Sequence, residues 1–266
     1  MTAPVAIITG GGTGIGAATA RTLRIEGWDV VICGRRMEPL QAVADETGAV
    51  PVCADAASTA DLDRLVAAAL DRFGRIDGLV LNAGIVRPSP VGALADEDWD
   101  AMVRTNLTGP FRLIRAALPS LIATRGAIVG VSSAASLRAT QDIAGYNATK
   151  AGLNMLIQSV AVDYGPQGIR ANAVCPGWTR TEMADMEMGE YGEGLGLDAE
   201  GAYARATSFV PSRRPASADE VSEVIAWLLS GKASYVNAAL IPVDGGMIAT
   251  DPGALAMDPR VSFGPA

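Results

Sequence analysis

Seven short apolar segments recur along the 266 residues of this chain, and segments of helical pattern separate most of them. Each apolar segment is nearly continuous in Val, Ile, Leu and Ala, which is typical of strands buried on both faces of a parallel sheet. Strand–helix–strand units of this kind need right-handed crossover connections. The pattern therefore predicts an α/β fold, a doubly wound parallel sheet of about seven strands in a single domain over residues 1–250. The predicted strands are Pro4–Thr9, Asp29–Cys33, Ala49–Cys53, Ile76–Leu81, Ala127–Val131, Ile169–Val174 and Ala238–Val243.

Helical periodicity fills most of the intervals between these strands. The predicted helices are Ala17–Glu26, Glu38–Thr47, Asp61–Phe73, Asp96–Thr124, Tyr146–Tyr164 and Ala218–Leu229. Residues 179–212 break the rhythm with repeated glycines, three methionines and many acidic residues. We interpret them as a loop-rich insertion that acts as a substrate lid, with a mobile, solvated excursion as the alternative. The tail, residues 251–266, has three prolines and no periodicity, and either wraps a neighbouring subunit or is partly disordered.

Charge and composition exclude several classes of protein. The formal net charge of −8 disfavours nucleic-acid binding, which needs a positive surface. No apolar run approaches the roughly 20 residues of a membrane span, and the first strand begins too early to leave room for a signal peptide. Three dispersed cysteines do not suggest a disulfide framework, so we expect a cytoplasmic protein. The chain has no histidine, which excludes a Ser-His-Asp hydrolase, and we expect no metal site.

The first strand runs directly into the segment Gly10-Gly11-Gly12-Thr13-Gly14-Ile15-Gly16, and a helical pattern follows it. Glycines allow positive φ and a close approach of the backbone to a ligand. The amides and the dipole of the following helix favour an anion such as a pyrophosphate. This order of strand, glycine turn and helix predicts a dinucleotide-binding turn.

Two arginines, Arg35 and Arg36, follow the second strand, where a dinucleotide fold meets the adenine ribose. An acidic residue at this point binds the 2′-hydroxyl of NAD, whereas an arginine accommodates the 2′-phosphate of NADP. Because the strand ends without a carboxylate, we expect NADP(H), with NAD(H) as the alternative.

Tyr146 and Lys150 are four residues apart, so on a helix they share one face. An ammonium within about 4–6 Å favours the ionised form of a phenol, whose ordinary pKa is about 10. Lowering that pKa to about 7 needs roughly 4 kcal/mol of differential stabilisation. We expect Lys150, together with a positively charged cofactor ring, to supply it and to make Tyr146 a proton donor and acceptor.

The predicted topology brings several of these residues together. In parallel sheets, ligands bind outside the carboxyl ends of the strands. The residues that directly follow predicted strands should therefore share one rim with Tyr146. They are Gly10, Arg35, Asp55, Asn82, Ser133 and Pro176.

On these residues, the chain resembles the compact, single-domain branch of the short-chain dehydrogenase/reductases from about Ala3 to Gly246. The Tyr-to-Lys spacing of four differs from the longer spacing of the enoyl-reductase offshoot. Thr179 stands where the family usually has Val or Ile, and Thr181 fills the later threonine position. The motifs that carry the resemblance are Thr9-Gly10-x-x-x-Gly14-Ile15-Gly16, Asp55, Asn82-Ala83-Gly84, Asn106, Ser133, Tyr146-x-x-x-Lys150, Asn172 and Pro176-Gly177.

The resemblance implies a Rossmann-like fold, a nicotinamide cofactor and, often, a homotetramer. By resemblance, Asp55 would meet the adenine, Asn82 would lie under the cofactor and Lys150 would hold the nicotinamide ribose. Asn106 would loosen its helix and hold a water that connects Lys150 to solvent. The expected cofactor-binding residues are Gly10, Gly12, Thr13, Gly14, Ile15, Gly16, Arg35, Arg36, Asp55, Ala56, Asn82, Ala83, Gly84, Tyr146, Lys150, Pro176, Gly177, Thr179 and Thr181.

The predicted activity is reversible hydride transfer between the nicotinamide and a carbonyl or secondary alcohol carbon of a small molecule. Ser133 would hydrogen-bond the reacting oxygen, Tyr146 would give or take its proton, and Lys150 would stabilise the phenolate. The acidic lid disfavours anionic substrates on charge alone. The expected catalytic residues are Asn106, Ser133, Tyr146 and Lys150, and the pocket candidates are Ser133, Leu137, Arg138, Gln141, Tyr146, Trp178, Met183 and Met186.

Three other functions remain as alternatives. The first is an NAD(H)-dependent alcohol or polyol dehydrogenase of the same family. The second is a protein that senses the dinucleotide without turnover, which the complete set of Ser133, Tyr146 and Lys150 disfavours. The third is a carrier-protein-linked 3-oxoacyl reductase. Such an enzyme would need a basic face to dock the carrier protein, whereas this acidic chain has only scattered arginines, such as Arg112, Arg115 and Arg125.

Overall fold

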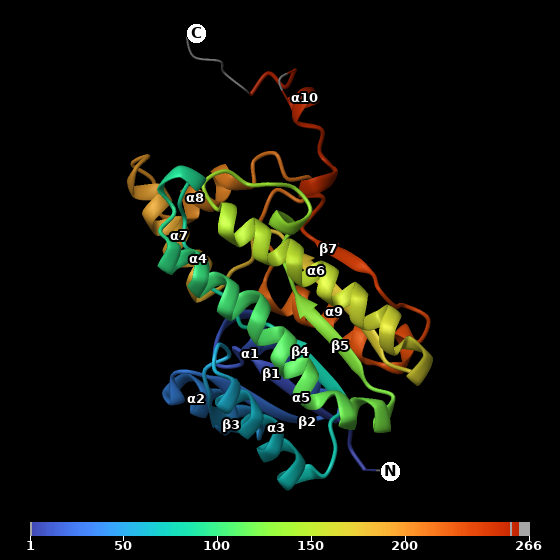
Figure 1. Cartoon of the computed structure of the whole chain (residues 1–266). Helices are drawn as coiled ribbons and strands as arrows, with labels where there is room; N and C mark the ends of the chain where they lie inside the picture. The colour runs from blue at the N-terminus through green and yellow to red at the C-terminus, as the bar shows by residue number, and fades with distance from the viewer. Residues whose placement is uncertain (1, 256, 261–266) are drawn as a thin grey trace.

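The computed structural model describes residues 2–255 and 257–260. Its centre is one sheet of seven strands in the order β3-β2-β1-β4-β5-β6-β7, all pairs parallel (Figure 1). The predicted α/β fold is confirmed. The strands are β1 Val5–Thr9, β2 Asp29–Gly34, β3 Val50–Cys53, β4 Gly78–Leu81, β5 Ala127–Val131, β6 Arg170–Pro176 and β7 Leu240–Val243.

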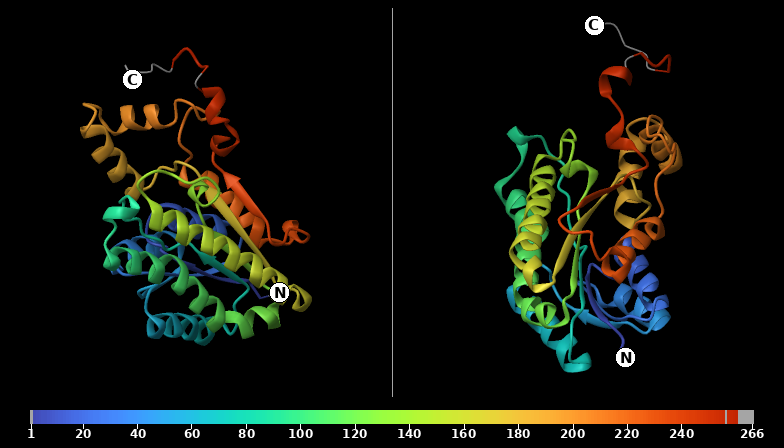
Figure 2. Two further views of the ribbon diagram at one scale, coloured as in Figure 1. Left: turned by 45° about the horizontal axis from the view of Figure 1, so that its top comes forward. Right: turned by 90° about the vertical axis from the view of Figure 1, so that its right-hand side faces the viewer.

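Helices cover both faces of the sheet (Figure 2). Helices α3 (Thr59–Phe73), α5 (Gly109–Thr124) and α6 (Ala144–Tyr164) pack on one face. Helices α1 (Gly14–Ile25) and α9 (Ala218–Leu229) pack on the other. The remaining helices are α2 Met37–Thr47, α4 Asp96–Val103, α7 Glu182–Glu193, α8 Ala199–Ala206 and the short α10 Pro252–Leu255.

The strands alternate their side chains between these two layers. Ile7 of β1 belongs to the core under α3, α5 and α6, whereas its neighbours Ala6 and Ile8 belong to the core under α1 and α9. All three side chains are fully buried. The near-continuous apolar runs of the sequence follow from this, because a strand covered on both faces has no polar side.

The strand order reverses between β1 and β4. The chain moves from β1 outward to β3, then returns to place β4 on the other side of β1. Ligands of open α/β sheets bind at such a reversal, outside the carboxyl ends of the strands. The topology therefore puts the loops after β1 and β4 side by side at the rim.

The predicted long helix over 96–124 is interrupted. Helix α4 ends at Val103, and Arg104–Thr108 form a π-helical segment before α5 begins at Gly109. A π turn shifts the hydrogen bonds to i→i+5 and takes a carbonyl out of the regular ladder. Asn106 lies in this segment and is fully buried.

The expectation that residues 179–212 are loop-rich was wrong. Helices α7 and α8 form there, and Met188, Ala202 and Tyr203 make a small buried core of their own. Short polar side chains begin both helices: the Thr181 side chain accepts from the Ala184 amide, and the Asp198 side chain from the Gly201 amide. These caps explain how a glycine-containing segment still forms helices. We call α7 and α8 the lid helices, after the lid that the sequence predicts over these residues.

The lid helices rise beyond the carboxyl ends of the strands (Figures 1 and 2). Two backbone hydrogen bonds close their base: Arg180 N to Ala216 O at 2.9 Å and Ala216 N to Trp178 O at 2.9 Å.

Arg260 of the tail packs over the Phe209 ring and donates to the Ser208 carbonyl. The predicted tail also includes residues 256 and 261–266, which lie outside the described residues. No helix in the described ranges is both long and apolar enough for a bilayer crossing.

Candidate active site

The glycine turn after β1 has the backbone that the sequence predicts. Gly10 and Gly14 have φ of 65° and 53°, in the region that glycine adopts readily. A Cβ on Gly16 would lie 2.2 Å from the Gly10 carbonyl oxygen, so this contact also demands glycine. Helix α1 begins at Gly14, earlier than the predicted Ala17, and its N-cap Thr13 makes no side-chain cap. The turn therefore presents an open helix N-terminus at the rim.

Asn82 ties the loop after β4 to this turn. Its Nδ2 donates to the carbonyls of Thr9 at 3.0 Å and Gly10 at 3.1 Å. The backbone amides of Asn82 and Ala83 in turn donate to Thr9 Oγ1, each at 3.0 Å. These bonds couple both sides of the strand reversal, so Asn82 holds the shape of the glycine turn.

Tyr146 and Lys150 lie on the first turns of α6, beside the end of β5. Lys150 is buried, and its Nζ donates to the Val131 carbonyl at 2.8 Å. The same nitrogen lies 5.6 Å from the centroid of the half-buried Tyr146 ring. Ser133 follows β5, and its side chain lies close enough to the Tyr146 phenol to lower the phenol pKa. The structure thus brings Ser133, Tyr146 and Lys150 together, as the sequence predicts.

The pKa values of this group follow mainly from burial. Burial raises the pKa of Tyr146 to about 12, the Ser133 side chain opposes the rise, and the charge of Glu187 adds to it. Burial also lowers the pKa of Lys150 to about 8. The side chains of the protein therefore hold Tyr146 as a neutral phenol at pH 7, and Lys150 alone does not bring its pKa down to 7. Desolvation is the largest of these effects.

Asn106 connects the π-helical segment to the loop after β4. Its Oδ1 accepts from the Ile85 amide at 2.8 Å, and its Nδ2 donates to the Ile85 carbonyl at 2.8 Å. Nδ2 also donates to Thr149 Oγ1, one residue before Lys150. Asn106 does lie where its helix loosens, as expected, and its side chain holds the Ile85 backbone and the hydroxyl of Thr149, the residue before Lys150.

The residues expected at the adenine end lie along the rim beyond the glycine turn. Arg35 and Arg36 are exposed after β2, and Arg36 begins α2 as its N-cap residue. Asp55 is half-buried after β3, and its Oδ1 accepts from the Ala57 amide at 2.9 Å. The Ala56 carbonyl packs against Gly109, where a Cβ would lie 2.2 Å from the oxygen.

The segment after β6 reaches the glycine turn from the other side. Thr179 is buried and its hydroxyl donates to the Gly177 carbonyl at 3.2 Å, so its side chain is engaged within its own loop. Thr181 packs directly on Gly14, because a Cβ there would lie 2.9 Å from Thr181 Cγ2. Of the two threonines, Thr181 is the one whose side chain meets the turn.

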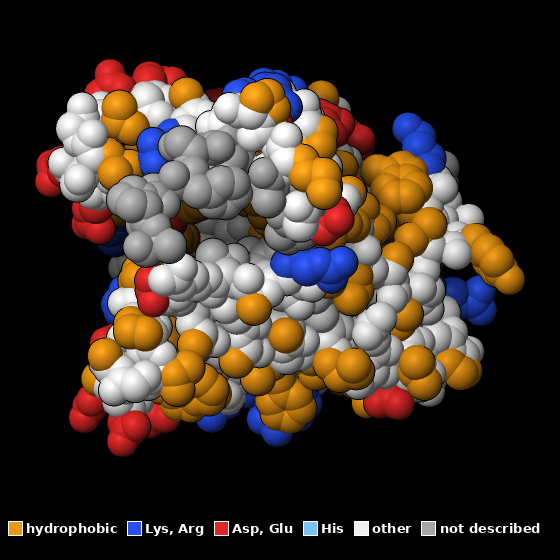
Figure 3. Space-filling view, turned by 90° about the horizontal axis from the view of Figure 1, so that it is seen from above, with side chains coloured by type: hydrophobic (Ala, Val, Ile, Leu, Met, Phe, Trp, Pro, Cys, Tyr) orange, Lys and Arg blue, Asp and Glu red, His pale blue; other side chains and the backbone are white. Residues whose placement is uncertain are grey.

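The predicted pocket residues differ in position. Leu137 is half-buried after the turn that carries Ser133, whereas Arg138 and Gln141 are exposed. Met183 and Met186 lie on α7 and are also exposed. In Figure 3, acidic side chains gather along the left-hand edge, on the side of the lid helices and α4.

Glu187 on α7 is not among the residues that the sequence predicts for the site. It is half-buried, and burial together with the nearby charge of Glu190 raises its pKa. Its own charge contributes to the raised pKa of Tyr146. The sequence alone gives no signal for this effect, because it acts between residues on different helices.

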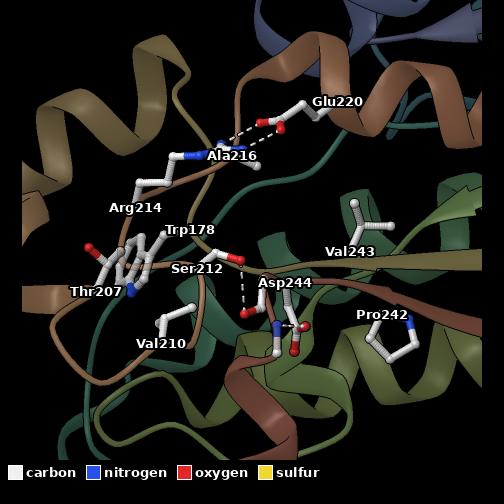
Figure 4. Close-up of a pocket in the computed structure, with 12 residues that line it drawn as sticks. Trp178, Thr207, Val210, Ser212, Arg214, Ala216, Glu220, Pro242, Val243 and Asp244 are labelled. Atoms are coloured by element: carbon white, nitrogen blue, oxygen red, sulfur yellow. Dashed lines mark hydrogen bonds and ion pairs between the residues drawn. The ribbon is translucent and has the colours of Figure 1, made fainter.

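A cavity of about 250 Å³ lies away from Tyr146, between the base of the lid helices and the end of β7 (Figure 4). Trp178 lines it, with the ion pair of Arg214 and Glu220 on one side and Asp244 on the other. Among the pocket candidates, Trp178 therefore faces this cavity. The predicted catalytic residues Ser133, Tyr146 and Lys150 gather elsewhere, on the α6 side of the rim.

Comparison with known proteins gives matches over nearly the whole chain. A family model described as enoyl-(acyl carrier protein) reductase matches residues 10–248. Protein MoaE of Klebsiella aerogenes is 42% identical over 255 residues, which are 94% of this chain and 97% of that protein. Levodione reductase of Leifsonia aquatica is 36% identical over 257 residues, 92% and 94% of the two chains.

Solved structures match the fold closely. An actinorhodin polyketide ketoreductase with NADPH has a TM-score of 0.88 at 34% identity, covering 93% of this chain and 99% of its own. A 3-ketoacyl-(acyl-carrier-protein) reductase from Brucella melitensis complexed with NADH has a TM-score of 0.83 at 30% identity, covering 92% and 98%.

Proposed function

The chain belongs to the short-chain dehydrogenase/reductase family, and from this premise we propose that it catalyses reversible hydride transfer between NADP(H) and a carbonyl or secondary alcohol. The observation that carries the proposal is the meeting of Ser133, Tyr146 and Lys150 at the rim beside the glycine turn. Those three groups can hold a carbonyl oxygen, protonate it and set the local charge.

The residues at the rim fit a dinucleotide. The glycine turn has no room for side chains at Gly10 or Gly16, and α1 begins without a side-chain cap. Such a turn leaves backbone amides free for phosphate oxygens. Thr181 and Arg35 lie on either side of it and would hold the nicotinamide and adenine ends. When bound, the dinucleotide supplies the hydride that the carbonyl carbon receives.

The roles of the protein side chains follow from their protonation. Tyr146 is a neutral phenol at neutral pH, because its pKa is raised to about 12. It can therefore donate a proton to the oxygen of a ketone as the carbonyl carbon is reduced. The Ser133 hydroxyl orients the same oxygen, and the buried Lys150 ammonium stabilises the phenolate that remains. In the opposite direction, Tyr146 must lose its proton before it can accept one from an alcohol.

The preference for NADP(H) rests on the two arginines after β2 and the lack of a carboxylate at the end of that strand. The similar structures carry NADPH in one case and NADH in another, so NAD(H) is the alternative cofactor.

Carbonyl reduction is favoured over reduction of an enoyl double bond. Tyr146 and Lys150 are one helical turn apart, a shorter spacing than that of enoyl reductases, although the matching family model is described by that name. Relatives also include carrier-protein-linked 3-oxoacyl reductases. The net charge of −8 disfavours this function, because an enzyme that docks a carrier protein would need a basic face. We also propose a cytoplasmic location, which the three free cysteines support, and a homotetrameric assembly.

The test is a panel of ketones with NADPH or NADH, followed at 340 nm. Tyr146→Phe should lower turnover by about 10²–10⁴-fold, the usual contribution of a general acid. Its NADPH affinity, measured by fluorescence, should stay near that of the wild type. Tyr164→Phe, at the other end of α6, is the matched control and should keep full activity. If Tyr146→Phe kept most of the wild-type activity, the proposed mechanism would be refuted. Cofactor binding without turnover of any ketone or alcohol would favour the sensor.

A further inference from the structure

An ion pair joins the lid to the expected 2′-phosphate site. Arg36 Nη2 lies 3.1 Å from Glu182 Oε2, although the two residues are 146 positions apart in the chain. Arg36 is one of the two arginines that follow β2, and Glu182 is the first residue of α7. The Glu182 carboxylate therefore pairs with a guanidinium that the proposed function assigns to the 2′-phosphate of the cofactor.

The backbone holds Glu182 at this position. Its neighbour Thr181 caps α7 through the Ala184 amide and packs on Gly14 of the glycine turn. The start of the lid thus touches the turn expected to hold the pyrophosphate, and the next residue reaches the arginine beyond it. The cap and the contact with Gly14 both fix the start of α7. The pairing of Glu182 with Arg36 therefore does not depend on the reach of the two side chains alone.

We propose that Glu182 is a specificity-determining residue for the cofactor, because its carboxylate and the 2′-phosphate of NADP(H) compete for Arg36. The inference rests on the proposed function. A 2′-phosphate that binds Arg36 must displace Glu182 and then lies near its negative charge. NAD(H) carries a hydroxyl at that position and meets neither cost. Glu182 therefore shifts the relative affinity toward NAD(H), whichever cofactor the protein prefers overall.

The size of the effect is limited by solvent. The side chains of Arg36 and Glu182 are 65% and 52% exposed. Exposed pairs of this kind contribute about 0.2–1 kcal/mol, which corresponds to about 1.4- to 5-fold in affinity at 1.4 kcal/mol per tenfold. The effect should weaken as the salt concentration rises, because exposed charges are screened.

The test measures binding alone and does not need turnover. Adenosine 2′,5′-bisphosphate and 5′-AMP differ only in the 2′-phosphate, so calorimetric titration of both isolates its contribution. Glu182→Gln should bind the bisphosphate about 1.4- to 5-fold more tightly than the wild type does and leave 5′-AMP unchanged. Glu193→Gln, at the far end of α7, removes the same charge and should leave both affinities unchanged.

The same gain for both nucleotides, no gain, or an equal gain in Glu193→Gln would overturn the proposal. In an Arg36→Gln background, the gain from Glu182→Gln should shrink. A gain of undiminished size there would show that Glu182 acts by charge alone and does not compete for Arg36.

Failure of the proposed function is distinguishable. A wild-type protein that binds neither NADPH nor NADH would refute dinucleotide binding itself. Equal affinities of Arg36→Gln and the wild type for the bisphosphate would instead refute only the competition for Arg36.

Discussion

Lys150 and Tyr146 face each other across one turn of α6, with the Lys150 Nζ 5.6 Å from the centroid of the Tyr146 ring. The same ammonium donates to the Val131 carbonyl at 2.8 Å. Burial acts on both groups in the same sense, since it disfavours the phenolate of Tyr146 and the ammonium of Lys150. The pair is therefore set for proton donation at neutral pH.

We expect the two reaction directions to respond oppositely to pH. Reduction needs the phenol, whose pKa is about 12, and the Lys150 ammonium, whose pKa is about 8. Its kcat/KM should be level between about pH 6 and 7.5 and should fall above pH 8. Oxidation needs the phenolate and should speed up with rising pH. Initial rates in both directions at constant ionic strength measure this. Oxidation that slows with rising pH would contradict the assignment of Tyr146.

Lys150→Met should separate stability from activity. The folded pKa of about 8 lies below the ordinary 10.5, so burial of the ammonium costs about 3 kcal/mol at neutral pH. Loss of the bond to Val131 costs about 1 kcal/mol. The variant should then be inactive yet about 1–2 kcal/mol more stable at pH 7.

The pH dependence of that gain provides its check. Between pH 8 and 10.5 the unfolded chain binds more protons at Lys150 than the folded protein does, so wild-type stability rises with pH there. The advantage of Lys150→Met in urea unfolding should therefore shrink from pH 7 to pH 9.5. A constant advantage would mean that the folded protein does not shift the pKa of Lys150.

Gly10→Ala should destroy the glycine turn, and Gly27→Ala is its matched control. Both glycines have positive φ, 65° and 84°. A Cβ at Gly27 meets no atom within 4 Å, whereas one at Gly10 lies 2.9 Å from Asn82 Nδ2. Gly27→Ala should cost about 1–2 kcal/mol of backbone strain and keep cofactor binding. Gly10→Ala should cost more and lose binding, as measured by thermal unfolding and NADPH fluorescence.

Asn82→Ala should weaken cofactor binding through the shape of the turn. It leaves the Thr9 and Gly10 carbonyls without their Nδ2 partner, at a cost of about 1–3 kcal/mol. Asn147→Ala also removes an amide bond to a carbonyl, that of Thr140, but away from the turn. If both variants bind NADPH alike, Asn82 does not shape the site.

Arg35→Ala tests the cofactor preference directly. Its guanidinium is exposed after β2 and would contact the 2′-phosphate. The variant should bind NADPH at least tenfold more weakly, since bonds between charged groups contribute about 1.5–3 kcal/mol, and NADH almost unchanged. Parallel loss of both affinities would instead indicate that Arg35 supports the fold.

Much of the molecule could be predicted from local patterns. The strand and helix periods, the glycine turn and the four-residue spacing of Tyr146 and Lys150 each depend on a few consecutive residues. Their placement at one rim follows because all strands of a parallel sheet end on the same side. The lid helices escaped prediction because repeated glycines interrupt their pattern, and because the caps by Thr181 and Asp198 were not considered.

The sequence alone therefore determined the sheet and the rim, since periodicity and spacing are properties of neighbours in the chain, and with the family resemblance it predicted which side chains react. Only the tertiary structure decided the direction of the Tyr146 pKa and the pairing of Arg36 with Glu182. The first depends on how much solvent the folded protein excludes from the phenol. The second joins residues far apart in sequence, whose distance is set by how the lid helices pack against the glycine turn.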